Sequence, residues 1–128
     1  MAETVGAAAT KSFALSVEEL VVDSCDPGKL ARFWMNVLGY ELYEDEAEIA
    51  SIEDPNGIGP AICFQKVPES KQVKNRVHLD LHVDEAELDQ AVERLLVLGA
   101  TRINEGENPE KSWVVLADPE GNEFCVVG

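Results

Sequence analysis

The chain repeats a set of landmarks at a nearly constant interval, and this constrains its fold more than any other feature. Val37-Leu38-Gly39 recurs sixty residues later as Val97-Leu98-Gly99. A D-P-x-G turn at Asp54–Gly57 is followed 64 residues later by a second one at Asp118–Gly121. Cys63 has a counterpart 62 residues later, Cys125. This spacing indicates one supersecondary unit that is used twice.

The first unit reads as strand, helix and three further strands. Asp26-Pro27 suits the N-cap and first position of a helix, and Gly39 suits its end. Between them, apolar residues recur at the spacing of a core-facing helix: Leu30, Phe33, Trp34, Val37 and Leu38. The alternation of apolar and polar residues predicts strands over 15–23, 40–43, 48–52 and 61–67.

The second unit repeats this order. Residues 76–83 alternate cleanly, with the polar face formed by Arg76, His78, Asp80 and His82. Asp84, with Glu87 three residues on, predicts a capping box for a helix that ends at Gly99. Further strands are expected over 100–104, 113–117 and from 123 onward, with a polar loop over 105–112.

We therefore expect repeat one at 14–67 and repeat two at 76–128, joined by a polar linker, within one domain at 14–128. Residues 1–13 are small and polar and are expected to form a flexible tail.

Composition excludes several classes of protein. Ten Lys and Arg against 25 Asp and Glu give a net charge of −15, which disfavours binding to nucleic acid or to anionic membrane surfaces. Three cysteines do not suggest a disulfide framework. The N-terminus has no signal-peptide pattern and no apolar run is long enough to span a bilayer, so we expect a soluble, cytoplasmic protein.

The tandem β-α-β-β-β pattern, with a D-P-x-G turn before the last strand of each unit, resembles the vicinal oxygen chelate superfamily. That group includes glyoxalase I, bleomycin- and fosfomycin-resistance proteins and extradiol dioxygenases, and the chain looks most like its small bacterial glyoxalase-like domains. The matching segments are 21–23 with 26–27 and 33–34, 37–39, 78–81, 98–101 and 118–126. The resemblance implies an α+β fold, with two repeats forming a cup-shaped mixed sheet and the helices outside.

The resemblance also implies where a ligand or metal would be held. Metal ligands in such families come from the first and last strands of each half, which here are the positions of Glu19, Cys63, His78 and Cys125. The metalloenzymes place a carboxylate in each last strand, where this chain has a cysteine. Glu19 and His78 are then the remaining ordinary metal ligands, so a divalent metal is possible but tight binding, and glyoxalase I activity, are not expected. A zinc site that recruits all four residues is the alternative.

The same side chains have simpler interpretations. His78 can titrate near neutral pH and act with Glu19 in acid–base catalysis, or it can be a hydrogen-bonded cavity residue. The cysteines can be small buried hydrophobes, and Trp113 can stack on a planar ligand or belong to the core. The candidate ligand-binding residues are Glu19, Cys63, Gln65, His78, Asp80, Trp113, Glu123 and Cys125.

Three functions follow from this pattern. The first is a binding protein of the bleomycin-resistance type, which sequesters a small organic molecule in the cup between the repeats. The second is a metal-dependent lyase, isomerase or dioxygenase. The third is an interaction module without a ligand, which the polar strand faces disfavour because an unused cup would be filled by apolar side chains. We expect a homodimer in each case, since small domains of this kind commonly pair about a twofold axis.

Overall fold

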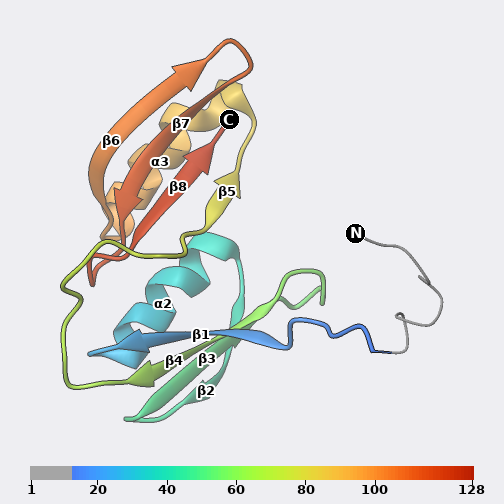
Figure 1. Cartoon of the computed structure of the whole chain (residues 1–128), viewed down its shortest axis with the longest axis vertical. Coiled ribbons are helices and arrows are strands. Elements are labelled where there is room, and N and C mark those ends of the chain that lie inside the picture. The colour runs from blue at the N-terminus through green and yellow to red at the C-terminus, as the bar shows by residue number, and fades with distance from the viewer. Residues whose placement is uncertain (1–12) are drawn as a thin grey trace.

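The computed structural model describes residues 13–128, which form two repeats of the predicted kind (Figure 1). The predicted flexible tail lies outside these residues except for Phe13. The first repeat contains β1 (Glu19–Ser24), α2 (Pro27–Leu38), β2 (Glu41–Asp45), β3 (Ile49–Glu53) and β4 (Ala61–Lys66). The second contains β5 (Asp80–His82), a short 3-10 turn η1 (Glu85–Glu87), α3 (Leu88–Leu98), β6 (Thr101–Asn108), β7 (Lys111–Ala117) and β8 (Glu123–Val127).

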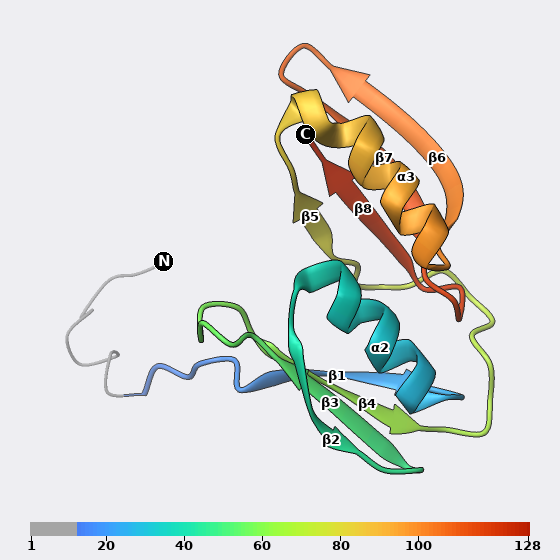
Figure 2. The same ribbon diagram turned by 180° about the vertical axis from the view of Figure 1, so that it is seen from behind.

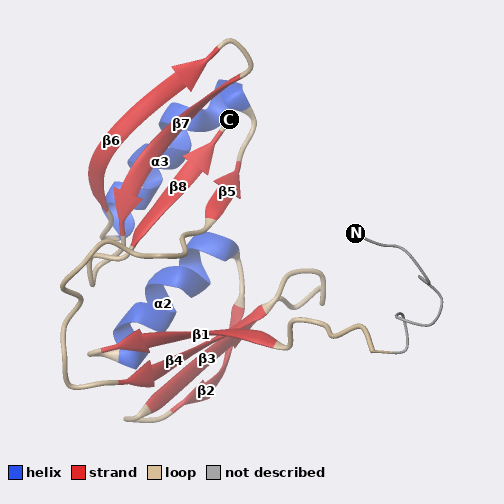
Figure 3. Ribbon diagram, viewed as in Figure 1, coloured by secondary structure: helices blue, strands red, loops and turns tan. Residues whose placement is uncertain are grey.

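Each repeat builds its own four-stranded mixed sheet. The strand orders are β1-β4-β3-β2 and β5-β8-β7-β6, and the first two strands in each order run parallel. Figures 2 and 3 show one helix packed on a face of each sheet. This arrangement confirms the α+β class and the β-α-β-β-β order. Within this chain the two sheets remain separate, with β1 and β5 as edge strands.

Cys63 and Cys125 occupy matching places in the two sheets. Each is the third residue of its strand, and each strand lies second in its sheet. Cys63 pairs with Val21 and Ser51, whereas Cys125 pairs with Asp80 and Val115. The constant spacing in the sequence thus reflects real equivalence between the repeats.

The predicted ends of the first helix are confirmed, whereas the predicted cap of the second helix is not. The side chain of Asp26 caps α2 by accepting from the Lys29 amide, and Gly39 ends the helix with a φ of 71°, a value that favours glycine. The predicted capping box at Asp84 and Glu87 is wrong. Asp84 instead precedes the 3-10 turn and makes no side-chain capping bond there.

Several strand boundaries differ from the prediction. Residues 15–18 are not part of β1, and β5 covers only three of the eight residues that alternate. Both segments lie at sheet edges, where the described residues supply no second strand to pair with them. The predicted loop over 105–112 is instead the tip and flanks of the β6–β7 hairpin, in which Glu105 pairs with Val114. The sequence pattern did not predict the full length of β6, because its residues are almost all exposed and the strand has no buried apolar face.

One hydrophobic core runs through both repeats. It includes Leu30 and Phe64 from the first repeat and Leu116 from the second. Phe33, Trp34 and Phe124 meet edge to face at its centre, and the Trp34 and Phe124 ring centroids are 4.9 Å apart. No helix in the described part of the chain has the length and apolar character needed to cross a membrane.

The second D-P-x-G turn also fastens the repeats together. Asp118, a buried residue, accepts a hydrogen bond from Trp34 Nε1 at 3.1 Å and further bonds from the turn's own donors. Glu120 reaches the start of α2, where it accepts from Ser24 Oγ at 2.6 Å and from the amides of Cys25 and Asp26. Among the described residues the first turn has no such role, because Asp54 there accepts only from amides within its own loop.

This asymmetry predicts unequal costs for two equivalent substitutions. Asp118→Ala should lower the free energy of unfolding by about 2–3 kcal/mol, because it leaves buried donors without acceptors. Asp54→Ala, the matched control in the first repeat, should cost clearly less. Urea unfolding of both variants measures the difference, and equal losses would show that Asp118 acts only within its own turn.

Candidate ligand site

Three predicted site residues meet on the second sheet. His78, Asp80 and Cys125 each offer a ligand atom within 4.8 Å of the others, and His78 Nε2 lies 3.1 Å from Asp80 Oδ1. Strand register explains the meeting. Asp80 and Cys125 are direct partners across β5 and β8, and His78 is two residues before Asp80 on the same side of the chain.

The cluster occupies the sheet face that is turned away from α3. On β8, Phe124 and Val126 are buried in the core, so Cys125 points to the opposite face and is partly exposed. Burial raises the pKa of the Cys125 thiol, and the adjacent Asp80 carboxylate raises it further. The thiol is therefore protonated at neutral pH and can donate a hydrogen bond, whereas a thiolate nucleophile is disfavoured.

Trp113 forms one wall of a hollow of about 290 Å³ that contains this cluster. The indole lies against Gly106 on the neighbouring strand, where a Cβ atom would come within 2.5 Å of its ring. Asn108, Lys111 and Val127 complete the lining. The sequence did not single out these last three. Asn108 and Lys111 lie within residues 105–112, which were predicted to form a loop, and only the pairing of β6 with β7 brings them to the site.

The remaining predicted residues lie elsewhere. Glu19, Cys63 and Gln65 belong to the first sheet and line neither this hollow nor the larger pocket described next. Cys63 is 4% exposed, Glu19 is partly buried and Gln65 is exposed. Among the described residues, the cluster with His78 is the one group of three or more potential metal ligands, and it includes neither Glu19 nor Cys63.

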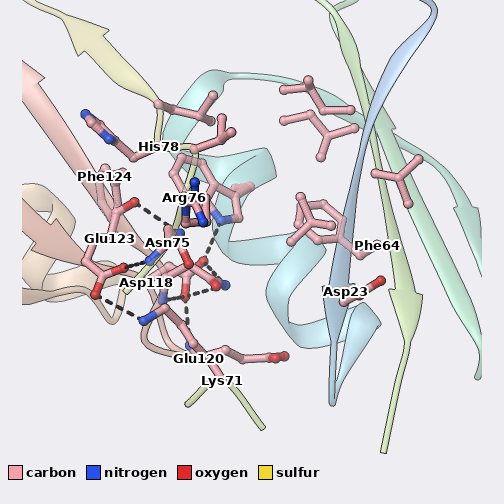
Figure 4. A pocket seen from close by; sticks show the side chains of 18 of the residues that line it. Asp23, Phe64, Lys71, Asn75, Arg76, His78, Asp118, Glu120, Glu123 and Phe124 are labelled. Atoms are coloured by element: carbon pink, nitrogen blue, oxygen red, sulfur yellow. Dashed lines mark hydrogen bonds and ion pairs between the residues drawn. The ribbon is translucent and has the colours of Figure 1, made fainter. Parts of the chain in front are cut away.

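A larger pocket of about 460 Å³ lies between the two repeats, and His78 also lines it (Figure 4). Glu123, a predicted ligand residue, belongs here. Its carboxylate accepts from Lys71 Nζ and from the Asn75 amide, both at 3.0 Å. The Asn75 amide, followed by Lys71, lowers the pKa of Glu123. Glu123 is thus held in an ion pair with the linker and is not part of the cluster around His78.

The comparisons with known proteins agree with the class that this fold defines, a tandem β-α-β-β-β protein. The model of the Glyoxalase-like domain matches residues 19–127, so the chain belongs to the glyoxalase-like domain family.

Solved structures show the same fold. A glyoxalase/bleomycin resistance protein/dioxygenase family enzyme from Burkholderia phytofirmans is 20% identical, with a TM-score of 0.73 over 88% of this chain and 98% of that one. A mutant of the fosfomycin resistance protein FosX from Listeria monocytogenes, solved with Mn(II) and a dihydroxypropylphosphonic acid, is 18% identical, with a TM-score of 0.73 over 88% and 89%. A glyoxalase-related enzyme from Fulvimarina pelagi is 18% identical, with a TM-score of 0.70 over 89% and 88%. At these identities the likeness establishes the fold alone.

Proposed function

We propose that this protein binds a small organic molecule on the outward face of its second sheet. The observation that carries the proposal is the convergence of His78, Asp80 and Cys125 beside Trp113 in one hollow. Ligand sites typically combine an apolar or aromatic wall with a few converging polar groups, and this hollow has both. Resistance by sequestration, without a chemical step, is the activity that fits such a site.

The side chains that line the hollow indicate which chemical groups its ligand carries. Trp113 presents an aromatic wall on which a planar group can stack. The Cys125 thiol and Lys111 supply donors, whereas Asp80 supplies an acceptor that His78 already engages. A planar molecule with both hydrogen-bond donors and acceptors therefore suits the hollow.

The hollow is shallow in one chain, and we propose that a second copy covers it. β1 and β5 are edge strands whose outer edges have no partner strand within residues 13–128. The extended segment before β1 exposes Phe13, Leu15 and Val17 on alternate residues, and Leu15 is 96% exposed. Apolar residues in an unpaired extended segment favour pairing with another strand. A twofold dimer would satisfy two such edges at once and place the first sheet of one copy, with Glu19, over the second sheet of the other.

A metal-dependent reaction is the second candidate, and the His78 cluster is the observation that favours it. Imidazole, carboxylate and thiol are all zinc ligands, and three protein ligands with an open fourth position characterise catalytic zinc sites. The chelating thiol must lose its proton first, and the raised pKa of Cys125 opposes this. For that reason binding without tightly held metal ranks first.

The ligand proposal predicts a selective loss of binding. In a thermal-shift screen of planar organic molecules, a true ligand should raise the melting temperature of the native protein, because it binds the folded state only. Trp113→Ala and His78→Ala should abolish that shift, whereas Lys29→Ala, an exposed change on α2, should preserve it. A ligand whose shift survives both site variants would refute this location.

Metal content tests the second candidate. Elemental analysis after gentle purification should find well under one metal ion per chain. Stoichiometric zinc that disappears in Cys125→Ser would contradict this expectation and make a metal-dependent reaction the preferred function. Cys25→Ser, which removes an exposed cysteine outside the cluster, is the matched control.

Assembly is tested by sedimentation at tens of micromolar. The native protein should sediment as a dimer, and Leu15→Asp should weaken the dimer about tenfold or more by placing a charge in the contact. Val97→Asp, which changes another highly exposed apolar residue at the end of α3, should leave the dimer intact. Monomer mass for the native protein would reject the dimer and leave the hollow open.

A further inference from the structure

The pocket between the repeats is a separate feature from the hollow around Trp113. Both repeats and the linker line it, and His78 is the one residue that both spaces share. Its walls include Leu20 and Val22 from β1 and Leu79 from the segment before β5. Its volume of about 460 Å³ lies within the range of small-molecule sites, typically about 300–1,000 Å³.

Three carboxylates at the base of this pocket are already engaged by the protein. Asp118 accepts from Trp34 Nε1 and from the Asn122 amide and side chain. Glu120 accepts from Ser24 and from two amides at the start of α2. Glu123 accepts from Lys71 and Asn75. These three carboxylates and Lys71 are already paired with other groups of the protein. The charges of a ligand would therefore be matched by other residues of the pocket.

Three other charged residues line the pocket without such partners. Arg76, Asp23 and Glu69 have no side-chain hydrogen bond or ion pair with any residue in the part of the chain that the structure describes. Asp23 lies near the end of β1, and Glu69 lies shortly after the end of β4. Because these two strands run parallel, both acids are near the carboxyl ends of neighbouring strands, at the same end of the first sheet. Arg76 stands at the other end of the linker, before β5. Figure 4 shows Asp23 on the side of β1 and Arg76 toward the second repeat.

We propose that this pocket binds an amphipathic zwitterion, an amino acid with a large apolar side chain. The guanidinium of Arg76 pairs with the ligand's carboxylate, and Asp23 with Glu69 attracts its ammonium group. The apolar side chain lies against Leu20, Val22 and Leu79. A ligand with only one of the two charges leaves the opposite set of pocket charges unmatched, so both groups contribute to recognition.

Three probes with the same indole ring separate these contributions. Calorimetry should show that L-tryptophan binds to the full-length protein, while tryptamine, which lacks the carboxylate, and indole-3-propionate, which lacks the ammonium, bind about tenfold more weakly or worse. L-Phenylalanine and L-leucine should also bind, because the apolar wall has no feature specific for indole. Failure of all three amino acids to bind at millimolar concentration would overturn the proposal, as would equal affinity for the three indole probes.

Charge-removing variants assign each contact. Arg76→Gln should weaken L-tryptophan and indole-3-propionate about tenfold and leave tryptamine unchanged. Asp23→Asn combined with Glu69→Gln should weaken L-tryptophan and tryptamine and leave indole-3-propionate unchanged. Lys74→Gln removes a neighbouring linker charge outside the pocket and should change none of the three affinities.

One further variant separates this pocket from the proposed ligand site. Trp113→Ala lies outside the inter-repeat pocket and should leave L-tryptophan binding unchanged. Loss of binding in this variant would place the amino acid in the hollow of the second sheet and overturn the inference, whatever the outcome for the proposed function.

Discussion

The hydrogen bond between the Trp34 indole and the Asp118 carboxylate is the contact on which the junction of the two repeats depends. A buried carboxylate is costly unless several donors satisfy it, and Asp118 obtains them from its own turn and from α2 of the other repeat. Next to it, Glu120 satisfies amides at the start of α2, where a negative charge also interacts favourably with the helix dipole. Together these contacts join α2 of the first repeat to the turn before β8 of the second.

Local chemistry made much of this fold predictable. Asp26 caps its own helix, and Gly39, Gly57 and Gly121 take positive φ values within their own turns, so these effects are visible in a short stretch of sequence. Strand extent is different because it depends on a partner. The alternation around His78 continues beyond β5, yet only three residues pair within the chain. Conversely, β6 lacks any apolar alternation and still forms an eight-residue strand, because β7 pairs with it along its whole length.

The same distinction between local patterns and pairing with distant strands explains how far the candidate site could be predicted. Alternation correctly placed His78, Asp80 and Cys125 on one polar face, but the register that joins Asp80 to Cys125 cannot be obtained from either strand alone. Glu19 and Cys63 were grouped with them through the resemblance to the vicinal oxygen chelate superfamily. In the described part of the chain these two residues lie on the first sheet, separate from the sheet that carries the cluster. Glu123, two residues from Cys125, forms an ion pair with Lys71 of the linker.

The two D-P-x-G turns differ in the parts of the protein that they connect, and this difference limits how the two repeats can be rearranged in the chain. The third position of the turn is Asn56 in the first repeat and Glu120 in the second, and only the glutamate reaches a helix of the other unit. A chain made of two copies of the first repeat would retain both loops and lose the fastening between them. The contact between the repeats therefore requires the turn of the second repeat and the start of α2 in the first, and exchanging the two repeats would break it.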